Sequence, residues 1–244
     1  MSMTGAALRQ TYPVPLEERA AFAELEFAGD AFVCDWTGCL YWPREGMLIV
    51  SDLHLEKGAA QAARGRLIPP YDTRATLKRL ETRIAEWRPR IVVSLGDSFH
   101  EAESSERMPS AYREQLAGLM KSREWVWIAG NHDPLPPADL GGTNCEELTL
   151  GGVTFRHKPE PACPSGEISG HLHPVARIVR RGKAVRRRCL VSDDVRMIMP
   201  AFGAFTGGLN IREPAFEGLF DPARLHAHLL GNQRVFTIGG DQLV

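Results

Sequence analysis

Four short apolar runs, each followed by a polar motif, constrain the fold of this chain more than any other feature. They occupy residues 47–50, 91–95, 125–128 and 153–155. Continuous apolar runs this short are typical of strands that are buried on both faces. Two helical patterns, 72–87 and 109–121, lie between the runs and place apolar residues on one face. The alternation of strand and helix predicts parallel strands joined by right-handed crossovers.

The polar motifs supply oxygen and imidazole ligands suited to divalent metals. In sequence order they are Asp52-Leu53-His54, Gly96-Asp97, Gly130-Asn131-His132-Asp133, a lone His157, and Gly170-His171-Leu172-His173. Ligands gather beyond the carboxyl ends of the strands in such sheets, so the sheet would bring these motifs together. Carboxylate, amide and imidazole groups without thiolate favour manganese, iron or zinc over a structural zinc site.

Seven side chains in these motifs are candidate metal ligands: Asp52, His54, Asp97, Asn131, His157, His171 and His173. They suffice for two adjacent ions that share one carboxylate. Such an ion pair is a common device for attacking a phosphoester with metal-bound hydroxide. A lone histidine is more often a surface or core residue, so only its place in the series makes His157 a candidate. The motifs predict a binuclear metallophosphoesterase.

The ordered motifs resemble the signature of the calcineurin-like metallophosphoesterase superfamily, over Asp52 to His173. The resemblance implies an α/β fold, a four-layer α/β/β/α sandwich of two mixed sheets. It assigns one ion to Asp52, His54, Asp97 and His173, and the other to Asp97, Asn131, His157 and His171. It also implies that His132 contacts the phosphate and assists the leaving group, with Asp133 orienting its ring.

Two further stretches resemble nucleases. Residues 96–100 are similar to a segment of the double-strand-break repair nucleases in this superfamily, which implies that His100 touches the scissile phosphate. A polar residue at a strand end is the equal alternative for His100. Residues 51–58, 67–73 and 200–210 resemble the bacterial ligase-associated DNA damage response endonuclease family. That resemblance implies a manganese-dependent endonuclease or phosphoesterase acting on DNA in repair, encoded with an ATP-dependent DNA ligase, a helicase and a nuclease.

A basic hairpin is predicted directly after the last metal motif. Its cations are Arg177, Arg180, Arg181, Lys183, Arg186, Arg187 and Arg188. The net charge of the chain is only −1, so any attraction to phosphate must be local. We expect Arg177, Arg180, Arg181 and Lys183 to bind the DNA backbone without sequence preference. A solvated face, or charges that protect an edge strand, is the alternative.

Length and composition fit one domain at residues 23–244, preceded by a flexible arm at residues 1–22. Five cysteines without C-x-x-C spacing argue against a disulfide framework, and Cys34 and Cys39 are expected to be buried. No apolar run reaches transmembrane length and no secretory apolar region is present. We therefore expect a cytoplasmic protein with no membrane partner.

Later elements and other functions complete the predictions. We expect a hairpin at 27–42 with its turn at 35–38, strands at 175–179, 185–191 and 195–199, a turn at Asp193-Asp194, and a capped helix at 221–230. His226 and His228 on that helix are assigned no metal role.

A small-molecule or nucleotide phosphoesterase is the alternative to a DNA-cleaving enzyme. A non-catalytic scaffold is disfavoured because all seven ligands and His132 are present. The native metal pair, the preferred DNA structure and the oligomeric state are left open.

Overall fold

The structure, a computed structural model, describes residues 21–66, 71–101, 103–135, 140–162 and 166–244, without the side chain of Arg180. The predicted arm at 1–22 and the segment 67–70 therefore lie outside the described residues, apart from Ala21 and Phe22. Phe22 already belongs to the first strand.

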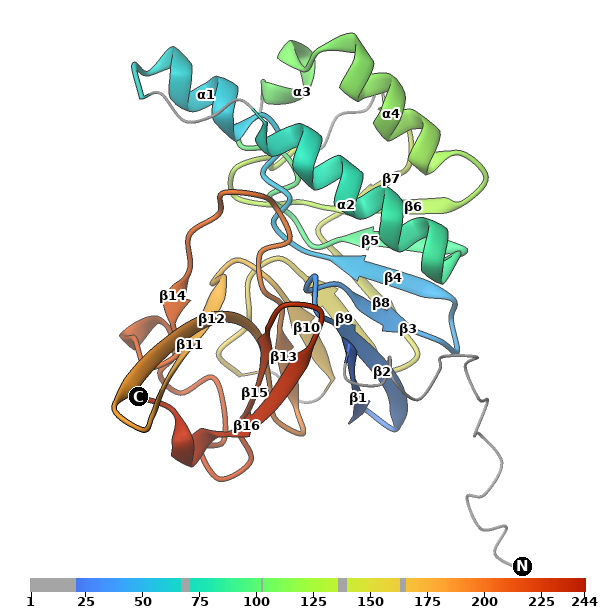
Figure 1. The fold of residues 1–244 in the computed structure, drawn as a ribbon. Coiled ribbons are helices and arrows are strands. Elements are labelled where there is room, and N and C mark those ends of the chain that lie inside the picture. The colour runs from blue at the N-terminus through green and yellow to red at the C-terminus, as the bar shows by residue number, and fades with distance from the viewer. Residues whose placement is uncertain (1–20, 67–70, 102, 136–139, 163–165) are drawn as a thin grey trace, which may run out of the picture.

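The first sheet has seven strands in chain order (Figure 1). They are β1 (Phe22–Phe27), β2 (Asp30–Asp35), β3 (Leu40–Trp42), β4 (Met47–Val50), β5 (Ile91–Ser94), β6 (Glu124–Ile128) and β7 (Thr143–Cys145). Strands β1 to β4 form an antiparallel meander, and β4 to β7 are parallel, as the apolar runs predict. The expected hairpin is one part of this meander, because the turn at 35–38 joins β2 to β3.

Helices cover one face of the first sheet (Figure 1). They are α1 (Lys57–Ala63), α2 (Asp72–Trp87), α3 (Ser104–Arg107) and α4 (Ser110–Met120). The apolar face of α2 buries Leu77, Leu80 and Ile84 against the sheet. The helix ends where Arg88 turns left-handed ahead of Pro89, which cannot continue it. Both helices predicted from periodicity are confirmed to within one residue.

The second sheet packs on the other face of the first one. Its strands are β8 (Glu147–Leu150), β9 (Val153–Arg156), β10 (Glu167–Ser169), β11 (Pro174–Arg180), β12 (Lys183–Ser192), β13 (Arg196–Ile198), β14 (Leu209–Asn210), β15 (His226–Leu230) and β16 (Val235–Gly239). Strand β10 is parallel to β9 and β13, and most other pairs are antiparallel. Phe32 and Trp42 from one sheet meet Phe155 and Ile168 from the other in a shared core. The predicted α/β fold with two mixed sheets is confirmed.

The predicted helix at 221–230 is wrong. Residues 226–230 form β15, which pairs with β12 on one side and β16 on the other. His228 is buried there between the hydroxyl groups of Ser192 and Thr237. Pairing with β12, which is distant in the sequence, and with β16, the next strand along the chain, outweighs the local helical pattern, because it buries both faces of the segment.

Short 3-10 helices therefore cover the outer face of the second sheet. They are η3 (Pro214–Phe216) and η4 (Gly240–Gln242), and Phe216 and Leu243 pack with Cys189 and Val191. Cys34 and Cys39 are buried, as predicted, and Asp193 forms the expected turn by accepting the amides of Val195 and Arg196. Among the described helices, none is long and apolar enough to cross a membrane.

Candidate metal centre

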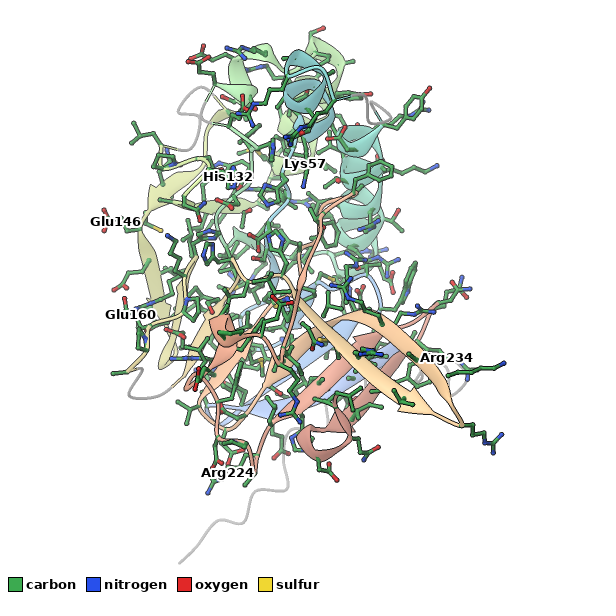
Figure 2. All side chains as sticks on the ribbon, turned by 90° about the vertical axis from the view of Figure 1, so that its left-hand side faces the viewer. Lys57, His132, Glu146, Glu160, Arg224 and Arg234 are labelled. Atoms are coloured by element: carbon green, nitrogen blue, oxygen red, sulfur yellow. The ribbon has the colours of Figure 1, made fainter. Side chains whose placement is uncertain are left out.

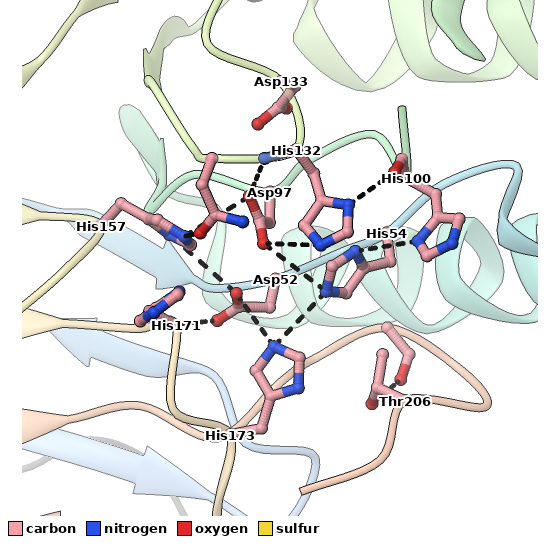
Figure 3. Close-up of polar contacts among 12 residues, drawn as sticks. Asp52, His54, Asp97, His100, His132, Asp133, His157, His171, His173 and Thr206 are labelled. Atoms are coloured by element: carbon pink, nitrogen blue, oxygen red, sulfur yellow. Dashed lines mark hydrogen bonds and ion pairs between the residues drawn. The ribbon is translucent and has the colours of Figure 1, made fainter. Parts of the chain in front are cut away.

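The polar motifs meet where five strands of the two sheets end, and Figure 3 shows their side chains gathered there. Asp52 follows β4, Asp97 follows β5, and Asn131 and His132 follow β6 in the first sheet. His157 follows β9, and His171 and His173 follow β10 in the second sheet. The predicted convergence of these side chains is therefore what the two sheets produce.

One group of ligand atoms comes from Asp52, His54 and His173, with one atom from each within 4.8 Å of the others. Asp52 Oδ1 lies 3.1 Å from His173 Nε2, which lies 3.4 Å from His54 Nε2. Asp52 is completely buried, and its Oδ1 accepts no hydrogen bond. A buried carboxylate oxygen without a hydrogen bond costs free energy unless a cation occupies the space before it.

The pKa values of Asp52 and His54 suit metal binding, whereas Asp52 raises the pKa of His173 against the effect of its burial. Burial by itself would raise the pKa of Asp52, but His173, His157 and His54 lower it to about 2. Burial lowers the pKa of His54 to about 3, with the charges of His173 and Lys57 adding to the effect. Neutral imidazole and ionised carboxylate are the forms that bind a metal.

The second group comes from Asp97, His157 and His171, and Asn131 lies beside it. His157 Nδ1 donates to the carbonyl of Leu95 at 2.8 Å, so its Nε2 presents a lone pair to the cluster. That nitrogen lies 3.0 Å from Asn131 Oδ1 and 3.4 Å from Asp97 Oδ1. With Nδ1 as the donor, the neutral imidazole turns three acceptor atoms toward one another at short range, an arrangement that a divalent cation would satisfy.

Asp97 lies between the two groups. Its Oδ1 faces His157 and also accepts the backbone amide of His132 at 2.9 Å. Its Oδ2 lies 3.9 Å from His54 Nε2 and 3.9 Å from His132 Nε2. The two oxygens of one carboxylate are therefore turned toward the two separate groups.

The backbone that carries these side chains is strained. Five candidate ligands have left-handed φ angles between 44° and 69°: Asp52, His54, Asp97, His171 and His173. Each such residue costs of order 1 kcal/mol, and clusters of them mark functional sites. Gly130 is required for a related reason, because a Cβ there would lie 2.1 Å from the amide nitrogen of Asp97.

His132 occupies the open side of the cluster, with 40% of its side chain exposed. Its Nδ1 donates to the carbonyl of His100 at 2.8 Å, and its ring stacks on that of His100. The expectation that Asp133 orients this ring is wrong, since the His100 carbonyl does so. Asp133 is buried and accepts the amide of Phe99 at 3.0 Å, and burial raises its pKa to about 7.

His100 also joins the cluster, since His54, His100 and His132 form a third close group. Its Nδ1 lies 3.5 Å from His54 Nδ1, and burial lowers its pKa to about 4. Lys57, at the start of α1, is a further residue of the site that the sequence motifs do not predict (Figure 2). Its charge lowers the pKa of His54 and of His100, and in the sequence it stands only within the stretch 51–58 that resembles the endonuclease family.

The basic hairpin extends from the cluster rather than lying along it (Figure 2). Strands β11 and β12 pair Val175 with Arg188 at the root and Arg180 with Lys183 at the tip. The strand from Pro174 to Arg180 separates His173 from the tip. The length of this strand is roughly 20 Å at the usual rise per residue. Arg186, Arg187 and Arg188 thus lie nearer the cluster than the predicted contacts Arg180, Arg181 and Lys183.

Comparison with known proteins agrees with this geometry. The model of the calcineurin-like phosphoesterase family matches residues 47–188. The chain is similar to the crystal structure of the Pseudomonas putida nuclease MPE, with 31% sequence identity and a TM-score of 0.69 over 89% of this chain and 100% of that chain. None of the curated proteins compared with the chain matches it. The cluster of candidate metal ligands, the two mixed sheets and the family match together show that the chain belongs to the calcineurin-like phosphoesterase family and is a metal-dependent phosphoesterase.

Proposed function

We propose that the protein is a binuclear-metal-dependent nuclease that hydrolyses phosphodiester bonds of DNA during repair. The observation that carries this proposal is the position of Asp97, whose two oxygens face two separate groups of ligands. The similarity to a nuclease supports a nucleic-acid substrate. The repair role is supported by the resemblance of three sequence segments to a DNA damage response endonuclease family.

The residues present fit a pair of divalent ions. Asp52, His54, Asp97 and His173 would hold one ion, and Asp97, Asn131, His157 and His171 the other. The buried Asp52 Oδ1 without a hydrogen bond and the facing acceptors around His157 support this division. Manganese suits the mixture of oxygen and imidazole donors, with iron or zinc as alternatives. When bound, such ions neutralise phosphate charge and activate water.

The residues of the chain would position and protonate the substrate. His132 is held through Nδ1, so its Nε2 is free to face the phosphate, and in the imidazolium form it donates a proton to the leaving oxygen. His100 stacks behind it and supplies the carbonyl that fixes the ring. Lys57 adds a positive charge on the side of His54 and His100. Asp133 supports the loop after β5 through the amide of Phe99.

An activity panel tests the proposed function. Single-stranded, duplex, nicked and flapped DNA are each incubated with manganese, magnesium or zinc, beside bis(p-nitrophenyl) phosphate and cyclic nucleotides. We expect manganese-dependent cleavage of DNA and a content of two metals per chain. Turnover of the small phosphoesters alone would contradict the DNA substrate. Two bound metals without turnover of any phosphodiester would instead favour a scaffold.

We further propose a cytoplasmic location and association with an ATP-dependent DNA ligase, a helicase and a nuclease. The family resemblance supports both. Co-purification of the tagged chain from cells, before and after DNA damage, tests the association. A ligase that fails to co-purify under both conditions would contradict it.

A further inference from the structure

A loop from Pro200 to Gly208 lies against the segments that carry the candidate metal ligands (Figure 1). The amide of Phe202 donates to the carbonyl of Ser51 at 2.8 Å, and that of Gly203 donates to the carbonyl of Asp52 at 3.1 Å. At the other end, a Cβ on Gly208 would lie 2.4 Å from the carbonyl oxygen of His173. The loop is therefore hydrogen-bonded to the backbone of Asp52 near its start and passes close to the carbonyl of His173 at its end.

Phe205, in the middle of this loop, is not explained by packing. Its side chain is 57% exposed, and its φ of 57° places it in the left-handed region. A bulky residue pays roughly 1–2 kcal/mol for that conformation, and exposure returns little of it. The Cα of Phe205 is two residues from Gly203, so it lies within about 7 Å of that residue. Phe205 is thus a strained, exposed aromatic residue in a loop whose preceding residues bond to the backbone of the candidate metal centre.

A pocket of about 280 Å³ lies beside the same loop. Its polar lining comes from Arg186, Arg187 and Arg188 on β12 and from residues 206–208 of the loop. Arg186 donates to the carbonyl of Gly208 and Arg188 donates to that of Ala201, each at 2.7 Å. In the part of the chain that the structure describes, no carboxylate lies within ion-pair distance of these three arginines.

A fourth cation increases the local charge. Arg79 of α2 donates to the carbonyl of Phe202, and Arg188 donates to the carbonyl of the preceding residue, Ala201. Burial lowers the pKa of Arg188 to about 10, and the charge of Arg79 adds to the effect. Like charges that are held close together without an acidic partner favour the binding of an anion between or beside them.

We propose that this loop and the root of β12 form a nucleotide subsite for unpaired DNA. Phe205 stacks on one nucleobase, and the arginine-lined pocket binds a neighbouring phosphate. The proposal rests on the proposed function and names its substrate more narrowly, because a base can stack on a side chain only after it leaves the duplex stack. Base–aromatic stacking of this kind contributes about 1–3 kcal/mol per base and is tolerant of sequence.

The test compares two fluorescent single strands of equal length, one with bases and one with abasic residues at its centre. Their phosphates are the same, so only the stacking contact differs. Binding is measured by anisotropy without added divalent metal, and cleavage is measured separately with manganese. Phe205→Ala should weaken binding of the base-bearing strand by about 5–150-fold and leave the abasic strand unchanged. Phe205→Trp should restore binding.

Three further variants separate stacking from folding and from charge. Phe205→Gly removes the left-handed strain, so its unfolding midpoint should not fall although binding falls as in Phe205→Ala. Phe236→Ala is the matched control, because Phe236 on β16 is similarly exposed at 51%. Arg186→Gln should weaken both strands alike, since both keep their phosphates.

The outcomes distinguish the two proposals. Equal losses on the two strands, or no loss in Phe205→Ala, would overturn the subsite even if the wild type cleaves DNA. Base-dependent binding through Phe205 without cleavage under any metal would keep the subsite and overturn the nuclease function. Absence of binding to either strand would overturn the subsite, and cleavage then decides the function alone.

Discussion

Two buried polar clusters in this molecule differ in how their charges are balanced. In the second sheet, Arg196 and Glu167 are both almost fully buried, and Arg196 Nε lies 2.8 Å from Glu167 Oε1. Glu167 also accepts the amide of Glu160 at 3.0 Å, and Arg196 donates to the carbonyl of Leu219 at 3.1 Å. Positive and negative charge therefore compensate each other within the fold.

At the strand ends, the charged or titratable groups that face the buried carboxylates of Asp52 and Asp97 are imidazole rings, beside neutral hydrogen-bond donors such as the amides of His132 and His171. In the described part of the chain, no arginine or lysine lies within ion-pair distance of either carboxylate. The backbone around them is also left-handed at several residues. A balanced cluster needs nothing further, whereas a cluster with excess negative charge and strained backbone is prepared for cations.

The largest effect on activity is expected at Asp97, because the strand-end cluster differs from the balanced cluster in its unpaired negative charge. Asp97→Asn keeps the shape but removes the charge that both groups share, so both ions should bind weakly. We expect a loss of activity larger than the about 10²–10⁴-fold typical of a lost general acid. Steady-state kinetics and metal analysis of the purified variant measure it. Wild-type metal content together with a wild-type rate would show that Asp97 does not join the two groups.

His132 separates the chemistry from metal binding. His132→Ala should keep two metals and lose about 10²–10⁴-fold in rate, because only the proton donor is removed. The assay uses DNA and bis(p-nitrophenyl) phosphate, with metal content measured on the same sample. A rate loss that follows metal loss would make His132 a ligand and would enlarge the metal cluster.

Arg196 tests the balanced cluster. Arg196→Met leaves Glu167 buried without its partner, which should lower the free energy of unfolding by about 3–5 kcal/mol. Urea denaturation measures it, and activity per folded molecule should be unchanged. Arg224→Met is the control, because the Arg224–Asp194 pair is exposed and should contribute about 0–1 kcal/mol. Equal destabilisation by both variants would remove the contrast between the two clusters.

The smallest effect is expected at the tip of the basic hairpin. Changing Arg180, Arg181 and Lys183 to glutamate should reduce the slope of log affinity against log salt by about 0.7–0.9 for each DNA phosphate that the variant no longer binds. Hydrolysis of bis(p-nitrophenyl) phosphate should stay the same, since the tip is roughly 20 Å along the strand from His173. An unchanged salt slope would leave the tip as a solvated edge and confine phosphate binding to the root.

The site could be predicted largely from sequence because its signals are local. The candidate ligands Asp52, Asp97, Asn131 and His157 each come after a short apolar run, and the carboxyl ends of parallel strands lie at a common edge of a sheet. Helix α2 was equally predictable, since its apolar spacing and Pro89 lie within one segment. A role for Lys57 could not be predicted in the same way, because the effect of its charge on His54 and His100 depends on their proximity in space.

The sequence by itself thus determined which residues are candidate metal ligands, and the order of their motifs implied the two mixed sheets and the family. Tertiary structure alone decided what depends on partners distant in the chain. Residues 226–230 became a strand because β12, from much earlier in the chain, pairs with them, and the ring of His132 is held by the His100 carbonyl rather than by Asp133. Likewise, the register of the hairpin placed Arg186 and Arg188 nearer the candidate metal centre and Lys183 farther from it. Local periodicity records which surfaces a segment must bury, but it does not record which backbone groups another segment will bring to it.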